Sequence, residues 1–289
     1  MHKQNESKLK IFSRFYRGSK KYFFSALGFP PEVRENVATV YNFCRYVDDV
    51  VDEPGKYPMT LSEFIDQYNH CLTTGICDLS LIEDFINLKK ELDFHDEWIE
   101  GLFNSMKMDS SGFKYMSIKD TLKYTYGVSE VIGLFMSKVL NIPEEAYPYA
   151  IKLGRAAQWI NFIRDIDEDN KMGRCYFPES DLKNFNLKNL EYSTALKHPQ
   201  NFKNFLNYQI DKYFEYANEG EKGYVLIPDK YLKPVIYSTE IDKWKARVIR
   251  ENPFVIYRRK VEPSYIKIFI EIIKANRSVS LKEELEINS

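Results

Sequence analysis

The sequence of 289 residues lacks several features that define large classes of proteins. Its four cysteines and four histidines show no zinc-like spacing, so free thiols in a reducing compartment are expected. The formal net charge of −1, and the lack of a basic cluster among aromatics, argue against nucleic acid as a partner. No apolar run approaches the ~18 residues of a transmembrane helix, and the first residues lack the apolar stretch of a signal peptide. These absences predict a cytoplasmic protein.

What the sequence does contain is helical periodicity. Apolar residues recur at helical spacing and predict helices over roughly residues 34–53, 61–72, 81–92, 117–140, 144–170, 201–222, 230–250 and 264–275. Strand-like alternation is scarce, and residues 174–178 form the one short candidate. Because no repeat or flexible linker interrupts this pattern, it predicts one all-α domain over residues 1–289, with its core at about residues 15–275.

Two acidic segments, far apart in the chain, look like halves of one site. Asp48 and Asp52 are four residues apart, as are Asp165 and Asp169. On a helix this spacing stacks the two carboxylates of each pair on one face. Pro and Gly residues stop both segments soon afterwards, so the charges lie near helix C-termini, where each is disfavoured by roughly 0.3–1 kcal/mol. A bound cation would offset this repulsion, and paired oxygen ligands point to Mg²⁺ shared with substrate phosphates.

The ordinary alternative for an acidic run is a solvated helix face. Two observations favour a site instead. The first segment is embedded among apolar residues such as Val47 and Val50, so much of its helix must be buried. In the second segment Gln158 and Asn161 share the acidic face, where polar side chains are costly unless paired. A buried amide network remains the alternative role of these two amides, and we predict that the metal ligands are Asp48, Asp52, Asp165 and Asp169.

These residues carry a close resemblance to the squalene/phytoene synthase family, the head-to-head branch of the trans-isoprenyl diphosphate synthases. The first matching pattern, Tyr-x-x-Cys-Arg-x-x-Asp-Asp-x-x-Asp, fills residues 41–52. The second, Gln-x-x-Asn-x-x-Arg-Asp-x-x-Glu-Asp, fills residues 158–169, and Gly-Arg-x-Tyr-x-Pro follows at 173–178. Weaker similarity elsewhere extends the resemblance over about residues 15–265. One departure is Ser129-Glu130, where many members have Ala-Gly, and this glutamate either faces solvent or alters the pocket.

The resemblance implies the isoprenoid-synthase helical fold around a central cavity. Four carboxylates and their Mg²⁺ ions would neutralise a diphosphate leaving group, and the resulting allylic cation would need a dry cavity with aromatic faces. Tyr41, one turn before Arg45, should project into that cavity. The resemblance gives Arg258, Arg259 and Lys260 as late phosphate-facing candidates without deciding among them. The expected catalytic residues are Asp48, Asp52, Asp165, Asp169 and Tyr41, and the expected substrate-binding residues are Arg45, Gln158, Asn161, Ser19, Tyr237, Tyr126, Ala26 and Ala38.

The implied reaction is the Mg²⁺-dependent condensation of two geranylgeranyl diphosphates to phytoene through a cyclopropylcarbinyl diphosphate. Ala38, whose Cα should lie roughly 15 Å from that of Asp48, and Ala26 would leave room for a twenty-carbon tail and favour this product, with ordinary helix packing as the alternative role of both alanines. The alternatives are a squalene or dehydrosqualene synthase using farnesyl diphosphate, a chain elongase or terpene cyclase, and a non-catalytic binding or assembly protein. NADPH is expected only if the product is squalene. Prenyl diphosphates are the expected partners, with peripheral membrane contact for product release, and the oligomeric state stays open.

Overall fold

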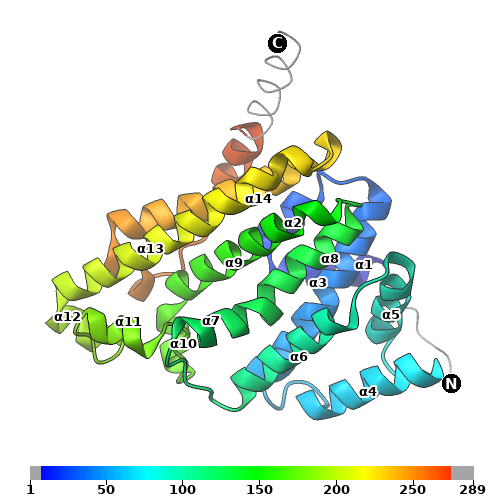
Figure 1. The fold of residues 1–289 in the computed structure, drawn as a ribbon, viewed down its shortest axis with the longest axis horizontal. Coiled ribbons are helices and arrows are strands. Elements are labelled where there is room, and N and C mark those ends of the chain that lie inside the picture. Colours follow the sequence, from blue (N-terminus) through cyan, green and yellow to red (C-terminus); the bar gives the residue numbers. More distant parts are fainter. Residues whose placement is uncertain (1–7, 275–289) are drawn as a thin grey trace, which may run out of the picture.

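The computed structural model describes residues 8–274, with side chains from residue 12 onward, and its regular elements in this range are all helical (Figure 1). The first half contains α1 Lys8–Gly18, α2 Lys20–Ala26, α3 Pro31–Asp52, α4 Leu61–Thr74, α5 Ser80–Leu92, α6 Asp96–Ser110, α7 Ile118–Thr125 and α8 Val131–Val139. The second half contains α9 Tyr147–Arg164, α10 Ile166–Lys171, α11 Glu179–Asn184, α12 Tyr192–Lys197, α13 Pro199–Glu221, α14 Asp229–Glu251 and a last helix over residues 265–274. The short helices are the π-helix Tyr126–Glu130 and the 3₁₀ turns Glu144–Ala146, Lys222–Leu226 and Pro253–Tyr257.

The helix that carries the first acidic segment, α3, follows directly from its sequence. Pro31 occupies its first turn, where the fixed φ of proline is compatible with a helix and its missing N–H would be unpaired anyway. Val33, Val37, Val40 and Phe43 form its buried stripe at steps of three and four. Burial of this stripe orients α3, and Val37 and Val40 of the stripe also line the cavity described below, on the same side as Asp48.

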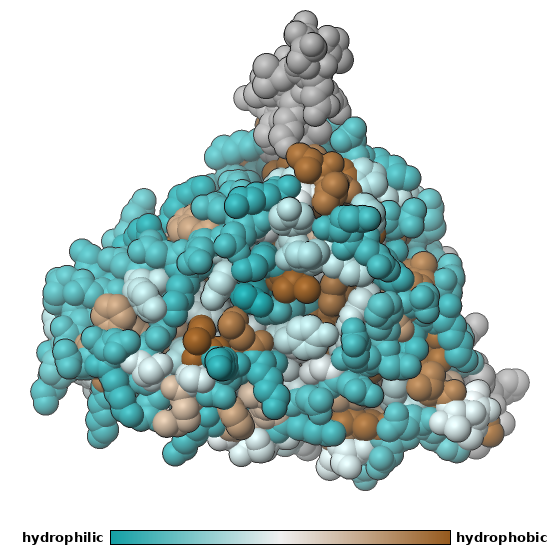
Figure 2. Space-filling view, viewed as in Figure 1, coloured by the Kyte–Doolittle hydropathy of each residue, from teal (hydrophilic) through white to brown (hydrophobic). Residues whose placement is uncertain are grey.

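Two aromatic-rich cores hold the helices together. In the first, Phe43 of α3 stacks on Phe85 of α5 with ring centroids 3.7 Å apart. In the second, Trp159 of α9 packs edge-on against Tyr216 of α13 at 5.4 Å. Figure 1 shows α9, α13 and α14 running side by side, and each pair is in contact. The outer face in Figure 2 is mainly hydrophilic, with hydrophobic side chains gathered in small groups.

The π-helix Tyr126–Glu130 packs against both α6 and α9. Gly127 makes this possible, because a Cβ at this position would lie 2.0 Å from the carbonyl oxygen of Gly101. On the other side, a Cβ on Gly154 would lie 2.4 Å from the carbonyl oxygen of Ser129. These two close approaches fix the spacing of three helices that border the cavity described below.

Most predicted helices are present, with three corrections. Helices α1, α2 and α6 and the short helices α11 and α12 were not predicted, although α6 has a regular apolar stripe through Trp98, Leu102 and Met106. The predicted helix 117–140 is divided by the π-helix, and the predicted helix 144–170 is divided at Asp165. The strand candidate at 174–178 is a loop, because no partner strand lies within residues 8–274.

The expectation of free thiols is wrong for two of the four cysteines. Cys71 and Cys77 form a disulfide, with their Cα atoms 4.7 Å apart. The cause is local: α4 ends at Gly75, whose φ of 73° turns the chain back on itself and brings Cys77 beside the last turn. Cys44 and Cys175 are free. Within the described range no helix has both the length and the apolarity needed to cross a membrane.

Candidate active site

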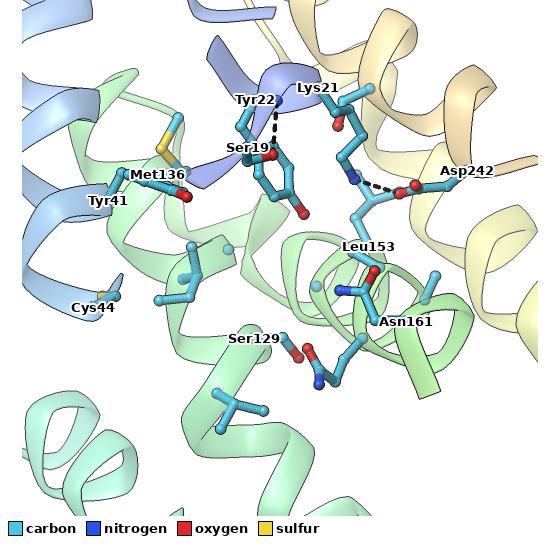
Figure 3. A pocket seen from close by; sticks show the side chains of 18 of the residues that line it. Ser19, Lys21, Tyr22, Tyr41, Cys44, Ser129, Met136, Leu153, Asn161 and Asp242 are labelled. Atoms are coloured by element: carbon cyan, nitrogen blue, oxygen red, sulfur yellow. Dashed lines mark hydrogen bonds and ion pairs between the residues drawn. The ribbon is translucent and has the colours of Figure 1, made fainter. Parts of the chain in front are cut away.

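A cavity of about 820 Å³ lies between the helices of the two cores. Its wall includes parts of α2, α3, α6, α8, α9, α13 and α14. In Figure 3, Tyr41 and Cys44 lie on one side of it, and Lys21, Asp242 and Asn161 lie on the other. Ionisable side chains line part of the wall, and apolar side chains such as those of Leu153 and Met136 line another part. The cavity is therefore amphipathic, with room for a charged group and an attached apolar chain.

The first acidic group is carried by α3. Asp48 and Asp52 both line the cavity, one helical turn apart. Burial, followed by repulsion from Asp52, raises the pKa of Asp48 to about 7. The side chain of Asp48 is 37% accessible, but that surface faces the cavity. Arg45 pairs with Asp48 at 3.2 Å and with Asp49 at 2.6 Å. Asp49 does not line the cavity and also accepts a hydrogen bond from the Tyr57 hydroxyl at 2.8 Å.

The second acidic group lies where α9 ends and α10 begins. Arg164 donates to Asp165 through Nε at 2.7 Å and through Nη2 at 2.5 Å. Burial alone would raise the pKa of Asp165, but Arg164, together with the charges of Lys260 and Lys245, outweighs burial and lowers it. For Asp169, burial and then repulsion from Asp165 raise the pKa to about 8. One aspartate of this pair therefore has a bound counter-charge, and the other carries a strongly disfavoured negative charge.

The fold brings the two acidic groups together across the cavity. Arg174 forms an ion pair with Asp52 and also lowers the pKa of Asp169. The charge of Asp52, in turn, raises the pKa of Asp169. Residues of α3 and α10, more than 100 positions apart in sequence, thus act on one another electrostatically.

Asp109, at the end of α6, is a further member of this acidic cluster that the sequence reasoning missed. It accepts hydrogen bonds from the hydroxyls of Tyr124 at 2.5 Å and Tyr176 at 3.0 Å. Burial is the main reason that its pKa is raised to about 6. Its charge contributes to the raised pKa of Asp48 and of Asp169. The apolar periodicity of residues 96–110 was the available signal, because it places Asp109 at the C-terminal end of a buried helix.

The acidic residues of the cavity would bind Mg²⁺ together with a substrate phosphate, not as a closed protein cage. Within residues 8–274, no three His, Cys, Asp or Glu side chains converge closely enough to hold one ion unaided. Buried carboxyls with raised pKa values, Asp48 and Asp169, nevertheless stand on opposite walls without enough positive charge near them. Mg²⁺ commonly binds through one or two carboxylates and completes its octahedral shell with water and substrate phosphates. The donor set fits that mode better than an all-protein cage.

Other predicted residues also lie on the cavity wall. Tyr41 lines it, and its ring packs on Phe15 with centroids 4.4 Å apart. Ser19 caps α2 by accepting from the backbone N–H of Tyr22 at 3.3 Å, and it lines the cavity as well. The remaining predicted residues on the wall are Arg45, Gln158, Asn161, Ala26, Asp165, Asp169 and, from the late basic run, Lys260.

Three predicted substrate-binding residues lie outside the cavity wall. Ala38 is fully buried in the first core, because the cavity-facing stripe of α3 runs through Val37 and Tyr41, and Ala38 lies about 100° away from Val37. Tyr126 packs on the backbone of Gly101. Tyr237 belongs to a small separate core. Helical spacing from Tyr41 placed Ala38 in the cavity, and the family resemblance placed Tyr126 and Tyr237 there; the rotation of their helices turns all three side chains away from the wall.

The departure at Ser129-Glu130 is resolved as a buried ion pair. The carboxylate of Glu130 is 2% exposed and accepts from Arg155 through Nε at 2.7 Å and Nη2 at 3.1 Å. The Thr125 hydroxyl donates to it at 2.9 Å. Glu130 therefore faces neither solvent nor the cavity, while Ser129 does line the cavity.

Comparison with known proteins agrees with this arrangement. A family model described as squalene/phytoene synthase matches residues 15–265. The 15-cis-phytoene synthase of Synechococcus elongatus is 24% identical over 264 residues, covering 84% of each chain. The 4,4'-diapophytoene synthase of Staphylococcus haemolyticus is 28% identical over 177 residues, covering 60% of this chain and 61% of that protein. The fold is similar to that of a crystallised dehydrosqualene synthase, with a TM-score of 0.85, 18% identity, and coverage of 94% of this chain and 96% of that one.

The all-α fold and the extended acidic motifs define a prenyltransferase of the phytoene/squalene synthase type. The chain belongs to the squalene/phytoene synthase family. This confirms the resemblance that its motifs predicted, the expected fold class, and the family-level reaction, which is head-to-head prenyl condensation.

Proposed function

We propose that the protein condenses two geranylgeranyl diphosphates head to head to give phytoene, in a reaction that depends on Mg²⁺. The observation that supports this most directly is the pairing of two acidic groups at one part of an 820 Å³ cavity that has a separate part lined by apolar side chains such as those of Ile132, Met136 and Leu153. A diphosphate headgroup matches the charged part, and a prenyl chain matches the apolar part. Its phytoene-synthase relatives agree with the product, at 24–28% identity.

Each charged residue has a definable task in this proposal. Asp48, Asp52, Asp165 and Asp169 would hold Mg²⁺, which when bound would neutralise the charge that develops on the departing diphosphate. Arg45 lies beside Asp48 and would donate a charge-assisted hydrogen bond to phosphate.

The polar and aromatic residues nearby would position the substrate. Gln158 and Asn161, one to two turns before Asp165 on α9, would donate to the same headgroup. Tyr41 lines the cavity one turn before Arg45, and its hydroxyl lies against Gly18, which is also on the wall. The pKa of Tyr41 is raised, chiefly by burial, so the hydroxyl stays protonated at neutral pH and remains available as a hydrogen-bond donor.

The length of the prenyl chain that the cavity would accept is inferred from Ala26. This residue is 2% exposed and lies on the cavity wall at the end of α2. A larger side chain there would occupy space needed by a long prenyl tail. Ala38 no longer supports the longer substrate, because it lies outside the wall. Farnesyl diphosphate giving squalene or dehydrosqualene remains the second candidate, and the 4,4'-diapophytoene synthase relative favours it.

We propose peripheral membrane contact through the helix at residues 265–274. Its outer face carries an exposed apolar stripe at steps of three and four: Ile266 at 74%, Phe269 at 64%, Ile270 at 41% and Ile273 at 38%. Lys267 and Lys274 flank the stripe and would lie at the level of lipid headgroups. A hydrocarbon product is insoluble in water, so a lipid-facing stripe on this helix would assist its release.

The direct test is to incubate the purified protein with geranylgeranyl or farnesyl diphosphate and Mg²⁺, without NADPH, and to identify the extracted hydrocarbon. Phytoene from the twenty-carbon substrate is expected, because phytoene forms by proton loss and needs no reductant. Asp48→Asn should reduce turnover by at least 100-fold, and Asp66→Asn, which changes an exposed aspartate of α4, is the matched control. A product that forms only when NADPH is added would refute the phytoene assignment.

A further inference from the structure

A buried ion pair lies directly behind the cavity wall, where the π-helix Tyr126–Glu130 meets α9. Glu130 is 2% exposed, and the side chain of Arg155 is 17% exposed. Arg155 donates to both carboxylate oxygens of Glu130, through Nε at 2.7 Å and through Nη2 at 3.1 Å. A buried ion pair adds little net stability, because the removal of two charges from water offsets most of their attraction. Its presence therefore points to the arrangement of helices that it imposes.

Two further contacts fix the orientation of this pair. The hydroxyl of Thr125, at the end of α7, donates to Oε1 of Glu130 at 2.9 Å. The guanidinium of Arg155 lies over the ring of Tyr216 on α13, 5.3 Å from the ring centroid. The pair consequently joins the π-helix, α9 and α13, and each of its charged groups has a second contact that limits its motion.

The pair also adjoins a very close backbone contact in the cavity wall. Ser129 precedes Glu130, and Gly154 precedes Arg155. A Cβ on Gly154 would lie 2.4 Å from the carbonyl oxygen of Ser129, and both residues line the cavity. The ion pair thus lies one residue away from the cavity surface on each side of this contact. A change in the separation of the two charged side chains would move both wall residues.

The same two walls carry polar residues that face the proposed substrate. On α9, Gln158 and Asn161 follow Arg155 by three and six residues, and both line the cavity. In Figure 3, the side chains of Ser129 and Asn161 are directed into the same part of the cavity, one from the π-helix and one from α9. Single π-helical turns occur frequently at functional sites. An ion pair that sets how the π-helix lies against α9 therefore sets the spacing between Ser129 and the two amides.

We propose that Glu130 and Arg155 are positioning residues, which hold the π-helix wall and the α9 wall of the cavity at the separation that a prenyl diphosphate requires. Neither side chain lines the cavity, so neither would touch the substrate. Position 130 is glycine in many members of the family, and glycine cannot form this ion pair, so the pair is a feature of this chain. The inference rests on the proposed function for the identity of the substrate.

The test separates positioning from stability. Farnesyl and geranylgeranyl thiolodiphosphate, two unreactive substrate analogues, are titrated into the whole protein in Mg²⁺ by calorimetry, and urea denaturation is measured alongside. Glu130→Ala and the double variant Glu130→Ala/Arg155→Met should each weaken binding about tenfold or more. The double variant leaves no unpaired charge, so it should regain stability without regaining affinity. Turnover measured in parallel should show a raised KM with a smaller change in kcat.

Two variants serve as controls. Glu130→Gln keeps an oxygen that can accept from Arg155 and Thr125, so it should lose less affinity than Glu130→Ala. Lys152→Met is the matched control on α9, because Lys152 pairs with Glu219 at 2.5 Å and does not line the cavity. Its loss should leave the affinity for both analogues unchanged.

Recovery of both stability and affinity in the double variant would refute the positioning role, and so would an equal loss of affinity in Lys152→Met. If the double variant does not fold, Arg155→Lys decides, because lysine keeps the charge and loses the planar fork that contacts both oxygens. A several-fold loss of affinity in folded Arg155→Lys supports the proposal, and unchanged affinity refutes it. These titrations need no turnover. Failure of the unchanged protein to form hydrocarbon would refute the proposed function alone, and unchanged affinity in the variants would refute the positioning role alone.

Discussion

Replacement of Asp169 by asparagine should abolish activity and stabilise the metal-free fold. The folded-state pKa of Asp169 is about 8, far above its ordinary value of 3.8, because of burial and repulsion from Asp165. Between those two pH values the folded state binds a proton that the unfolded state has lost, so the free energy of unfolding falls as pH rises through this window. Asparagine is neutral throughout and removes that loss.

The expected gain in stability follows from the difference between the folded-state pKa of Asp169 and its ordinary value. At pH 7.5, the window from the ordinary pKa of 3.8 up to this pH corresponds to a loss of about 5 kcal/mol, at 1.36 kcal/mol per pH unit. Cavity water screens part of it, so we expect Asp169→Asn to raise the free energy of unfolding by about 2–4 kcal/mol at pH 7.5. The gain should shrink steadily toward pH 4.5, where Asp169 approaches neutrality in both states.

The assay is urea denaturation in EDTA at pH 4.5, 6.0 and 7.5, with turnover measured separately in Mg²⁺. Asp167→Asn is the control on the same helix: Asp167 is paired with Lys171 at the surface, and its loss should change stability by less than about 1 kcal/mol. A variant of Asp169 that is less stable than the unchanged protein at pH 7.5, or whose gain does not depend on pH, would contradict the electrostatic account. Full activity in Mg²⁺ would remove Asp169 from the proposed metal site.

Three further predictions concern other parts of the chain. Ala26→Phe should shift the ratio of kcat/KM for the two substrates at least tenfold toward farnesyl diphosphate, because Ala26 lies on the cavity wall. Ala38→Phe should instead lower the free energy of unfolding by about 1–3 kcal/mol through overpacking of the core. Unchanged selectivity in a folded Ala26→Phe protein would contradict the chain-length argument. Glu130→Ala should lower the free energy of unfolding by about 3 kcal/mol in denaturation experiments, because it leaves Arg155 buried without its partner. The double variant Glu130→Ala/Arg155→Met should recover much of that loss. A Glu130→Ala variant as stable as the unchanged protein would contradict the buried ion pair as a source of stability. Phe269→Ser should reduce sedimentation with anionic vesicles several-fold while turnover in detergent stays the same, and equal sedimentation would exclude this helix as the contact.

The sequence by itself determined the helical class and the two acidic segments. Apolar residues at steps of three and four make α3 and α9 helical in any compact fold, and the four-residue spacing of Asp48 and Asp52 then places both on one face. The extended motifs were sufficient for the family, because each combines charges, amides and turn residues in a fixed order.

Only the tertiary structure decided which other side chains face the cavity. A helix turns 100° per residue, so a small difference in its rotation moved Ala38 into the core and kept Val37 on the wall. The same holds for contacts between distant segments. Asp109 joined the acidic cluster because α6 packs beside the π-helix, and Lys21 met Asp242 across 221 positions of sequence because α2 packs on α14. The periodicity of apolar residues within one helix does not tell which other helix it will face. The packing of the two cores decides that.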